Sequence, residues 1–234
     1  MNRPIRLWAA AAGIVLACAI GLWIGAHRLA GSNDAAFGKR VRAYILAHPQ
    51  IVAEAAERLR IEPVREAVET PFRGAWAGNP HGDVTLVMFT DYNCPYCRAS
   101  APEIDRLLAS DPKVKVVWRE MPVLGPGSDQ AAAAALAAAR QGKYLPFHRA
   151  LFSGGHPDKD GIVVAANAVG LSPASLIAGS KTRDVQAEIA ANLSIARRLG
   201  ISATPFFIIG NRTHEGALGY DALAAAVAEA RDIQ

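Results

Sequence analysis

Two cysteines separated by two residues, Cys94 and Cys97, are the side chains of this sequence best suited to covalent chemistry. The remaining one of its three cysteines, Cys18, lies in an apolar run where it serves as a small hydrophobic residue. A disulfide between Cys94 and Cys97 would stabilise the fold little, because the loop it closes is very short. A zinc site would need two more ligands, and the histidines are scattered along the chain. The spacing therefore favours redox chemistry over a structural disulfide or a zinc site.

The residues around this pair predict a strand that leads into a helix. Residues 84–90 are β-branched and apolar enough for a strand buried on both faces. Pro95 suits the first position of a helix, so Cys94 is expected at its N-terminus. Unpaired N–H groups and the positive end of the helix dipole favour the thiolate there. We therefore expect Cys94 to be the reactive, accessible partner and Cys97 to resolve mixed disulfides.

The rest of the sequence predicts a helical block between strands. Pro102 should kink the helix that begins near Cys94. Strands are expected at 114–118, 205–209 and 212–215, and a final helix at 221–230 with Asp221 as its N-cap. Between the first two of these strands, apolar periodicity and turn residues predict helices at 130–140, 144–152, 162–169, 174–178 and 184–199.

The charge of the chain is concentrated at its N-terminus. With 25 basic and 21 acidic residues the net charge is +4, but residues 1–28 hold three arginines and no acidic residue. The remainder has 22 basic against 21 acidic residues and a net charge of +1. Residues 7–26 carry no charge, and a helix of that length spans about 30 Å, the thickness of a hydrocarbon core. The excess positive charge therefore flanks the apolar run, as expected for arginines that orient a segment in a membrane. No nucleic-acid partner is expected.

The apolar segment 7–26 has three interpretations. An uncleaved signal anchor is favoured, because the run is long for a signal peptide and its small-residue cleavage site is weak. A cleaved signal peptide and a lipid anchor at Cys18 are the alternatives. All three place the rest of the chain outside the cytoplasm, in a bacterial periplasm, tethered to the inner membrane or released after cleavage. A hydrophobic content of 51% excludes disorder as the main state of the chain.

Residues 37–60 predict an amphipathic helical arm. Its apolar residues recur at helical spacing, and His48–Pro49 marks a break. This segment is either a spacer helix packed on its own domain or a homo-oligomerisation arm.

Taken together, these elements resemble the thioredoxin fold, and more closely the DsbA-like thiol:disulfide oxidoreductases, in which a helical domain interrupts that fold. The matching segments are 91–97, 119–125 and 200–205, within a resemblance over about residues 72–232. Glutaredoxins share Cys-Pro-Tyr-Cys, but Cys94 and Pro205 are 111 residues apart, which leaves room for an insertion that glutaredoxins lack. The segment 44–52 is similar to the N-terminal region of the copper-sensitivity suppressor (ScsC) type, some members of which oligomerise that way.

The expected fold class is therefore α/β: a thioredoxin fold with an inserted helical domain, preceded by a signal anchor and an amphipathic helical arm. The expected boundaries are 1–30 for the anchor or signal peptide, 31–70 for the arm or linker, 71–127 for the first part of the thioredoxin fold, 128–199 for the insertion and 200–234 for the second part.

The resemblance also implies roles for particular residues. Thr204–Pro205 would be a cis-proline loop facing the cysteines, and substrate would bind along Tyr96, Thr204, Pro205 and Phe206. Many relatives hold an acidic proton acceptor six positions before the first cysteine. Met88 occupies that position here, so Asp91 or Glu120 is the candidate acceptor.

The implied function is an enzyme that forms or rearranges disulfides in exported proteins that contain cysteine. It would use the Cys94–Cys97 disulfide as its redox group, with no other cofactor and no metal, and would need a membrane redox partner. The sequence leaves oxidase, isomerase and reductase directions open. A thiol-based copper(I) chaperone or sensor on the same fold is the alternative, since two thiolates suit a soft ion.

Overall fold

The computed structural model describes residues 19–23, 34–154 and 157–232. The chain forms two compact units, Met1–Ala53 and Glu54–Gln234, which are described separately. Most of the expected membrane segment 7–26 lies outside the described residues, apart from an exposed helical stretch at 19–23. Among the helices that the structure describes, none is long and apolar enough to span a bilayer.

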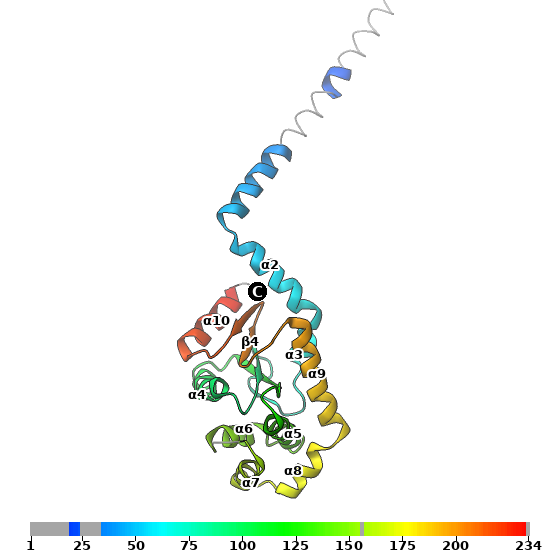
Figure 1. Ribbon diagram of the computed structural model, residues 1–234. Coiled ribbons are helices and arrows are strands. Elements are labelled where there is room, and N and C mark those ends of the chain that lie inside the picture. Colours follow the sequence, from blue (N-terminus) through cyan, green and yellow to red (C-terminus); the bar gives the residue numbers. More distant parts are fainter. Residues whose placement is uncertain (1–18, 24–33, 155–156, 233–234) are drawn as a thin grey trace, which may run out of the picture. The chain divides into compact units, whose positions relative to one another are not determined.

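A five-stranded mixed sheet organises the second unit (Figure 1). The spatial order is β1-β3-β2-β4-β5. Strands β2 and β3 run parallel and the other neighbours are antiparallel. The strands are β1 (Trp76–Gly78), β2 (Val84–Thr90), β3 (Val114–Glu120), β4 (Phe206–Ile209) and β5 (Arg212–Glu215). The α/β thioredoxin fold expected from the sequence is confirmed.

Helices cover both faces of this sheet, and five of them form the insertion between β3 and β4. Before β1 lie α2 (Gln50–Ile61), the 3₁₀ helix η1 (Glu62–Val64) and α3 (Arg65–Glu69). Helix α4 (Pro95–Ser110) follows β2, and α10 (Tyr220–Asp232) ends the described chain. The insertion consists of α5 (Pro126–Arg140), α6 (Tyr144–Ser153), α7 (Lys159–Ala168), α8 (Pro173–Ser180) and α9 (Arg183–Leu199).

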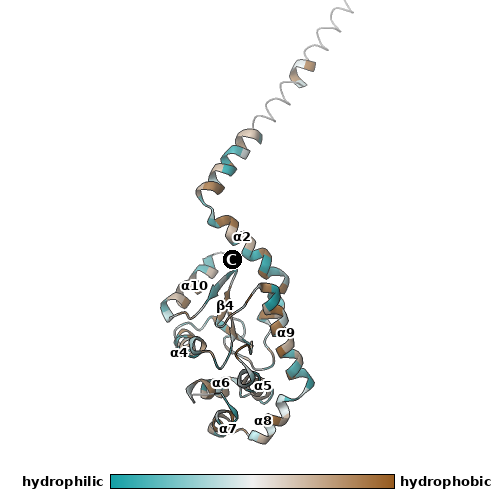
Figure 2. Ribbon diagram, viewed as in Figure 1, coloured by the Kyte–Doolittle hydropathy of each residue, from teal (hydrophilic) through white to brown (hydrophobic). Residues whose placement is uncertain are grey.

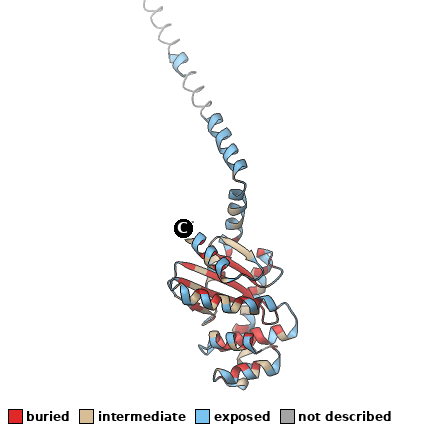
Figure 3. Ribbon diagram, turned by 90° about the vertical axis from the view of Figure 1, so that its left-hand side faces the viewer, coloured by how far each residue is buried: buried red, intermediate tan, exposed pale blue. Residues whose placement is uncertain are grey.

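Two hydrophobic clusters lie on opposite faces of the sheet. Alternate residues of a strand point to opposite faces, so Leu86 and Met88 enter one cluster while Val87 and Phe89 enter the other. The first cluster packs against α4, α10 and the insertion, and the second against α3 and α9. Burial on both faces explains why β2 reads as a continuous apolar run. In Figure 3 the inner strands β2, β3 and β4 are accordingly mostly buried, in red, whereas the outer strand β5 is not.

The structure differs from the sequence-based elements in several places, and the helices α5, α7, α8 and α10 all begin earlier than predicted. Strand β1 was not predicted, because three residues carry no readable periodicity. Strand β3 continues two residues past its predicted end and so reaches Glu120. Asp221 lies inside the first turn of α10 and is not its N-cap. The backbone N–H of Tyr220 instead donates to Oε2 of Glu103 at 3.1 Å. A carboxylate of α4 thus accepts the hydrogen bond of an N–H group at the start of α10.

The expected arm consists of two helices, at residues 34–47 and α2, separated by the predicted break at His48–Pro49. The later part packs on its own domain: Ile61 is fully buried, and Arg212 forms a 2.8 Å ion pair with Glu54. The helix at 34–47 is exposed throughout its length (Figure 3). Hydrophobic and hydrophilic residues alternate along both helices (Figure 2).

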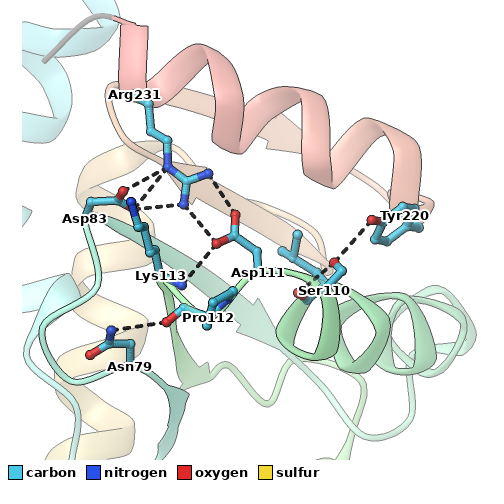
Figure 4. Close-up of polar contacts among 9 residues, drawn as sticks. Asn79, Asp83, Ser110, Asp111, Pro112, Lys113, Tyr220 and Arg231 are labelled. Carbon is cyan, nitrogen blue, oxygen red and sulfur yellow. Dashed lines mark hydrogen bonds and ion pairs between the residues drawn. The ribbon is translucent and has the colours of Figure 1, made fainter.

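Polar contacts fix α10 to the loops at the edge of the sheet (Figure 4). Arg231 forms 2.8 Å ion pairs with both Asp83 and Asp111. These hydrogen bonds lower the pKa of both carboxyl groups. At the other end of the helix, the hydroxyl of Tyr220 contacts that of Ser110 at 3.1 Å. The C-terminal helix is thereby held at both ends.

Arg119 ties three elements together from within the protein. Arg119 is 3% exposed, and its Nη1 forms a 2.7 Å ion pair with Glu188 of α9. Nε donates to the carbonyl of Val68 at 3.0 Å, and Nη2 donates to the carbonyls of Ala67 and Thr70. The guanidinium therefore satisfies the end of α3 while joining it to β3 and α9.

Removing this guanidinium should strongly destabilise the fold. We expect Arg119→Ala to lower the free energy of unfolding by about 3–5 kcal/mol, because Glu188 and the carbonyls at the end of α3 lose their buried partner. Arg149→Ala is the matched control, since its ion pair with Asp105 is exposed and should contribute less than about 1 kcal/mol. Urea unfolding measures both, and equal losses would contradict the assignment.

Candidate active site at the Cys94–Cys97 pair

Cys94 lies at the junction of β2 and α4, as the sequence predicted. It is the N-cap residue of α4, and Pro95 occupies the first helical turn. The backbone N–H of Cys94 donates to the carbonyl of Asp91 at 3.1 Å, and its carbonyl accepts from the N–H of Arg98 at 3.1 Å. Pro102 lies inside the same helix, as expected. The cysteine sulfur is thus held at the helix end where unpaired N–H groups gather.

The loop before β4 closes over this sulfur. The Thr204–Pro205 peptide bond is cis, as expected. The thiol of Cys94 donates to the carbonyl oxygen of Thr204, with the sulfur and oxygen 3.1 Å apart. This loop covers Cys94, which is only 3% exposed. The expectation that its thiol is accessible to solvent is therefore wrong for this form of the protein. Cys97 is fully buried, so Cys94 remains the outer of the two.

The two thiols differ in their surroundings. Burial raises the pKa of Cys97 to about 12, and nearby hydrogen-bonding groups, among them the backbone of Asp91, offset this only in part. Cys97 is therefore a protonated thiol at neutral pH in this form of the protein. Such an inner thiol must lose its proton before it can attack a disulfide.

Asp91 acts as a clamp between two loops. The residue is 1% exposed, and both oxygens of its carboxylate accept hydrogen bonds. Oδ1 accepts from the N–H of Asn93 at 2.8 Å and from the hydroxyl of Ser128 at 2.6 Å. Oδ2 accepts from the N–H groups of Val123 and Leu124 at 2.8 and 3.0 Å. These four donors hold the carboxylate in place between the two loops.

Apolar side chains flank the pair, but not all of those expected. Tyr96 is 63% exposed, and Thr204 is half-buried beside Cys94. Phe206 does not reach this surface: it is buried in the second hydrophobic cluster, because both faces of β4 are covered. Val123 and Leu124, which the sequence reasoning missed, are 44% and 49% exposed on the loop that Asp91 holds. Their segment was recognised, but nothing in its spacing showed that it lies beside the cysteines.

A buried polar cluster surrounds Glu120 at the end of β3. Oε1 of Glu120 accepts hydrogen bonds from the hydroxyls of Tyr144 at 2.7 Å and Tyr92 at 3.0 Å. Nδ1 of His148 lies 2.8 Å from the Tyr92 oxygen. Among the described residues, Oε2 of Glu120 has no hydrogen-bond partner. Sequence reasoning singled out Glu120 but missed the other three, which are far apart in the chain.

Burial shifts the ionisable members of this cluster toward their neutral forms. It raises the pKa of Glu120 to about 8, although the two tyrosine hydroxyls act in the opposite direction. It lowers the pKa of His148 to about 3. The cluster is near the cysteines: Glu120 pairs with Thr90 across the parallel strands, and Cys97 is among the groups that raise the pKa of Tyr92. Glu120 therefore holds an exchangeable proton close to the inner thiol.

No group of three or more potential metal ligands occurs in the part of the chain that the structure describes. The chemical resources of the site are thus the two thiols, the buried acid and the backbone of the cis-proline loop.

Comparisons with known proteins agree with this geometry. The DSBA-like thioredoxin domain model matches residues 85–228, and the model of the copper resistance protein ScsC N-terminal domain matches residues 34–61. A thioredoxin-like oxidoreductase from Silicibacter pomeroyi is 44% identical, with a TM-score of 0.65 over 67% of this chain and 91% of that one. The catalytic domain of Proteus mirabilis ScsC is 29% identical, with a TM-score of 0.68 over 74% and 97%.

A match of a different kind is to a longer protein. The Na(+)/H(+) antiporter NhaA 3 of Salinispora tropica is 31% identical over 176 residues, which are 68% of this chain. This chain spans about a quarter of the length of that curated relative.

The buried cluster predicts a characteristic dependence of stability on pH. The folded state holds a proton on Glu120 that the unfolded chain loses above its usual pKa of 4.5, so stability falls as pH rises toward 8. His148 acts oppositely, and stability rises from pH 3 to its usual pKa of 6.5. The two effects cancel between about 4.5 and 6.5, which leaves a net fall of up to about 1.4 kcal/mol per pH unit from 6.5 to 8.

Urea unfolding at pH 6.5 and 8 measures this effect. Glu120→Gln should abolish the fall between these values, because the amide does not titrate, whereas Glu215→Gln, at the exposed end of β5, should leave it intact. A fall that persists in Glu120→Gln would show that another group is responsible.

Proposed function

Because the chain belongs to the DSBA-like thioredoxin domain family, we propose that it exchanges disulfides with exported proteins that contain cysteine, through Cys94 and Cys97. The observation that carries this proposal is the contact between the Cys94 sulfur and the Thr204 carbonyl, 3.1 Å apart. It joins a Cys-Pro-Tyr-Cys helix start to a cis-proline loop, which gives the sulfur an adjacent backbone edge for a substrate strand.

In the oxidising direction, a substrate thiolate attacks the Cys94–Cys97 disulfide at Cys94 and expels Cys97. A second substrate thiolate then attacks the substrate sulfur of this mixed disulfide and expels Cys94. The substrate loses two electrons and two protons, and the enzyme is left as a dithiol. A membrane redox partner restores the disulfide.

In the isomerising or reducing direction, Cys94 attacks a substrate disulfide and Cys97 resolves the intermediate. The reduction potential decides the direction, and that potential depends on how strongly the fold favours the dithiol. In either direction no other cofactor takes part, and the redox group is the cysteine pair itself.

Substrate binding involves the exposed groups around Cys94. Tyr96 and the pair Val123–Leu124 offer apolar surface, while the half-buried Thr204 offers backbone for pairing with an extended chain. Pro205 is buried, has no N–H, and its carbonyl already accepts from the N–H of Gly216 at 2.9 Å, so it shapes the loop and does not pair with substrate. Phe206 contributes only indirectly, because it is buried at the start of β4 and supports the cis-proline loop from there.

Glu120 is the better of the two candidates for proton exchange with Cys97, and it accepts a proton only in its ionised form, which is the minor form at pH 7. All the hydrogen bonds to the Asp91 carboxylate come from fixed donors, whereas Oε2 of Glu120 has no partner in the described part of the chain. A pKa of about 8 lets Glu120 exchange a proton near neutral pH.

The copper(I) alternative receives less support. A two-thiolate site needs both sulfurs deprotonated, and burial raises the pKa of Cys97 to about 12. Forming that site at neutral pH therefore requires the metal ion to displace the proton of Cys97.

We also place the catalytic unit outside the cytoplasm. The uncharged run at 7–26 and its flanking arginines support a tether to the inner membrane, with release by cleavage as the other outcome.

Single substitutions of the two cysteines should separate their roles. Cys94→Ala should abolish exchange with a reduced, unfolded substrate, because the attacked sulfur is lost. Cys97→Ala should accumulate mixed disulfides visible on non-reducing gels, since nothing resolves them. Cys18→Ala is the matched control and should behave as wild type. Exchange that survives in Cys94→Ala would overturn the proposal.

The exposed helix at 34–47 supports homo-oligomerisation as part of this function. Phe37, Val41 and Tyr44 recur on one face, and they are 60%, 39% and 59% exposed. Apolar surface on this scale commonly marks an interface, and burying each side chain would contribute about 1.5–3 kcal/mol. We propose that copies of this chain cover one another there.

Charged substitutions on that face should break the assembly. Val41→Asp with Tyr44→Asp should reduce the sedimenting mass of the full chain to that of a monomer, because carboxylates cannot be buried unpaired. Val164→Asp, at an exposed apolar position of α7, is the control and should leave the mass unchanged. A mass that is the same in all three proteins would contradict the proposed interface.

A further inference from the structure

The helical insertion contains a cavity away from the cysteines. It lies among α5, α7 and α8 and has a volume of about 580 Å³. None of the residues that line it belongs to β2, α4 or the cis-proline loop. Volumes of this order are typical of small-molecule sites.

The alanine-rich sequence of α5 explains why this space is not filled. Ala134, on the cavity floor, is 4% exposed and contributes only a methyl group. At Gly179 helix α8 approaches α5 closely, since an added Cβ would lie 3.0 Å from the Cβ of Ala137. Ile162, Leu176 and Ile177 supply the aliphatic walls, and among the described residues no aromatic side chain lines the space.

The polar residues of the cavity make it cationic. Lys159 and Lys181 line it together with one acidic residue, Asp160. Among the described residues neither lysine has an ion pair or a side-chain hydrogen bond. Two unpaired ammonium groups beside an aliphatic surface are complementary to an anionic group at the end of a hydrocarbon chain.

We propose that this cavity binds a single-chain anionic amphiphile, with its carboxylate at Lys159 and Lys181 and its aliphatic chain along Ala134 and the walls from α7 and α8. The volume of about 580 Å³ lies within the range of pockets that bind one small molecule. The site does not depend on the proposed disulfide exchange.

Photocrosslinking of the full chain in phosphatidylcholine nanodiscs tests this site, with dodecanoate that carries a diazirine on its alkyl chain as the probe. Peptide mass spectrometry should locate the label on α5, α7 or α8. Unmodified dodecanoate should compete for labelling, and dodecyltrimethylammonium should not, because its charge opposes the two lysines. Label spread evenly over the surface, or equal competition by both amphiphiles, would overturn the proposal.

Two sets of variants address the charge and the volume. Lys159→Gln with Lys181→Gln should weaken competition by dodecanoate about three- to tenfold, as two weak ion pairs are lost. Lys113→Gln with Lys143→Gln is the charge-matched control and should have no effect. Ala134→Leu should reduce labelling by filling the space, with its fold checked by thermal unfolding.

Lys159 and Lys181 are exposed, so the double lysine variant should fold. It keeps the test decisive if Ala134→Leu does not fold. It should retain wild-type disulfide exchange, which separates this inference from the proposed function. Unchanged dodecanoate binding in the lysine variant would overturn the proposal, as would displacement of the probe only by an acidic, apolar peptide.

Discussion

The in-register pairing of β2 with both of its neighbours is the constraint on which the candidate site depends. Parallel pairing places Thr90 beside Glu120, so the loops that follow β2 and β3 leave the sheet at the same edge. Antiparallel pairing with β4 places Phe206 beside Phe89, so the preceding Pro205 enters at that edge as well. Three segments distant in sequence therefore meet around Cys94. A shift by one residue would exchange the buried faces of every strand involved.

The last two residues of β3 connect the sheet to the helical layers on its two sides. Because neighbouring strand residues point in opposite directions, Arg119 reaches α3 and α9 while Glu120 reaches Tyr92 and Tyr144. Arg119 is charged and fully paired, whereas burial keeps Glu120 neutral near pH 7. One residue thus stabilises the domain, and the other places a titratable group within reach of the redox chemistry. Adjacent buried polar residues serve different purposes because their partners differ.

The helical insertion contributes to the site in an unequal way. Helix α6 supplies Tyr144 and His148 to the buried cluster, and the loop that leads into α5 carries Val123 and Leu124 beside the cysteines. Helices α7 and α8 make no such contribution, and together with the small side chains of α5 they enclose the aliphatic cavity. The insertion therefore supports the cysteine site with α6 and the loop before α5, and separately forms an aliphatic cavity lined by two lysines.

The sequence alone determined the elements and the chemistry that each carries. Strand β2, the helix start at Cys94 and the five helices of the insertion could be predicted because propensity and periodicity are local. The tertiary structure decided what those patterns do not contain. The burial of Cys94 and Phe206, the four donors that occupy Asp91 and the grouping of Glu120 with His148 all arise between segments far apart in the chain. Which side chains are buried, and with which partners, depends on how the strands pair, and this pairing leaves no mark in local sequence.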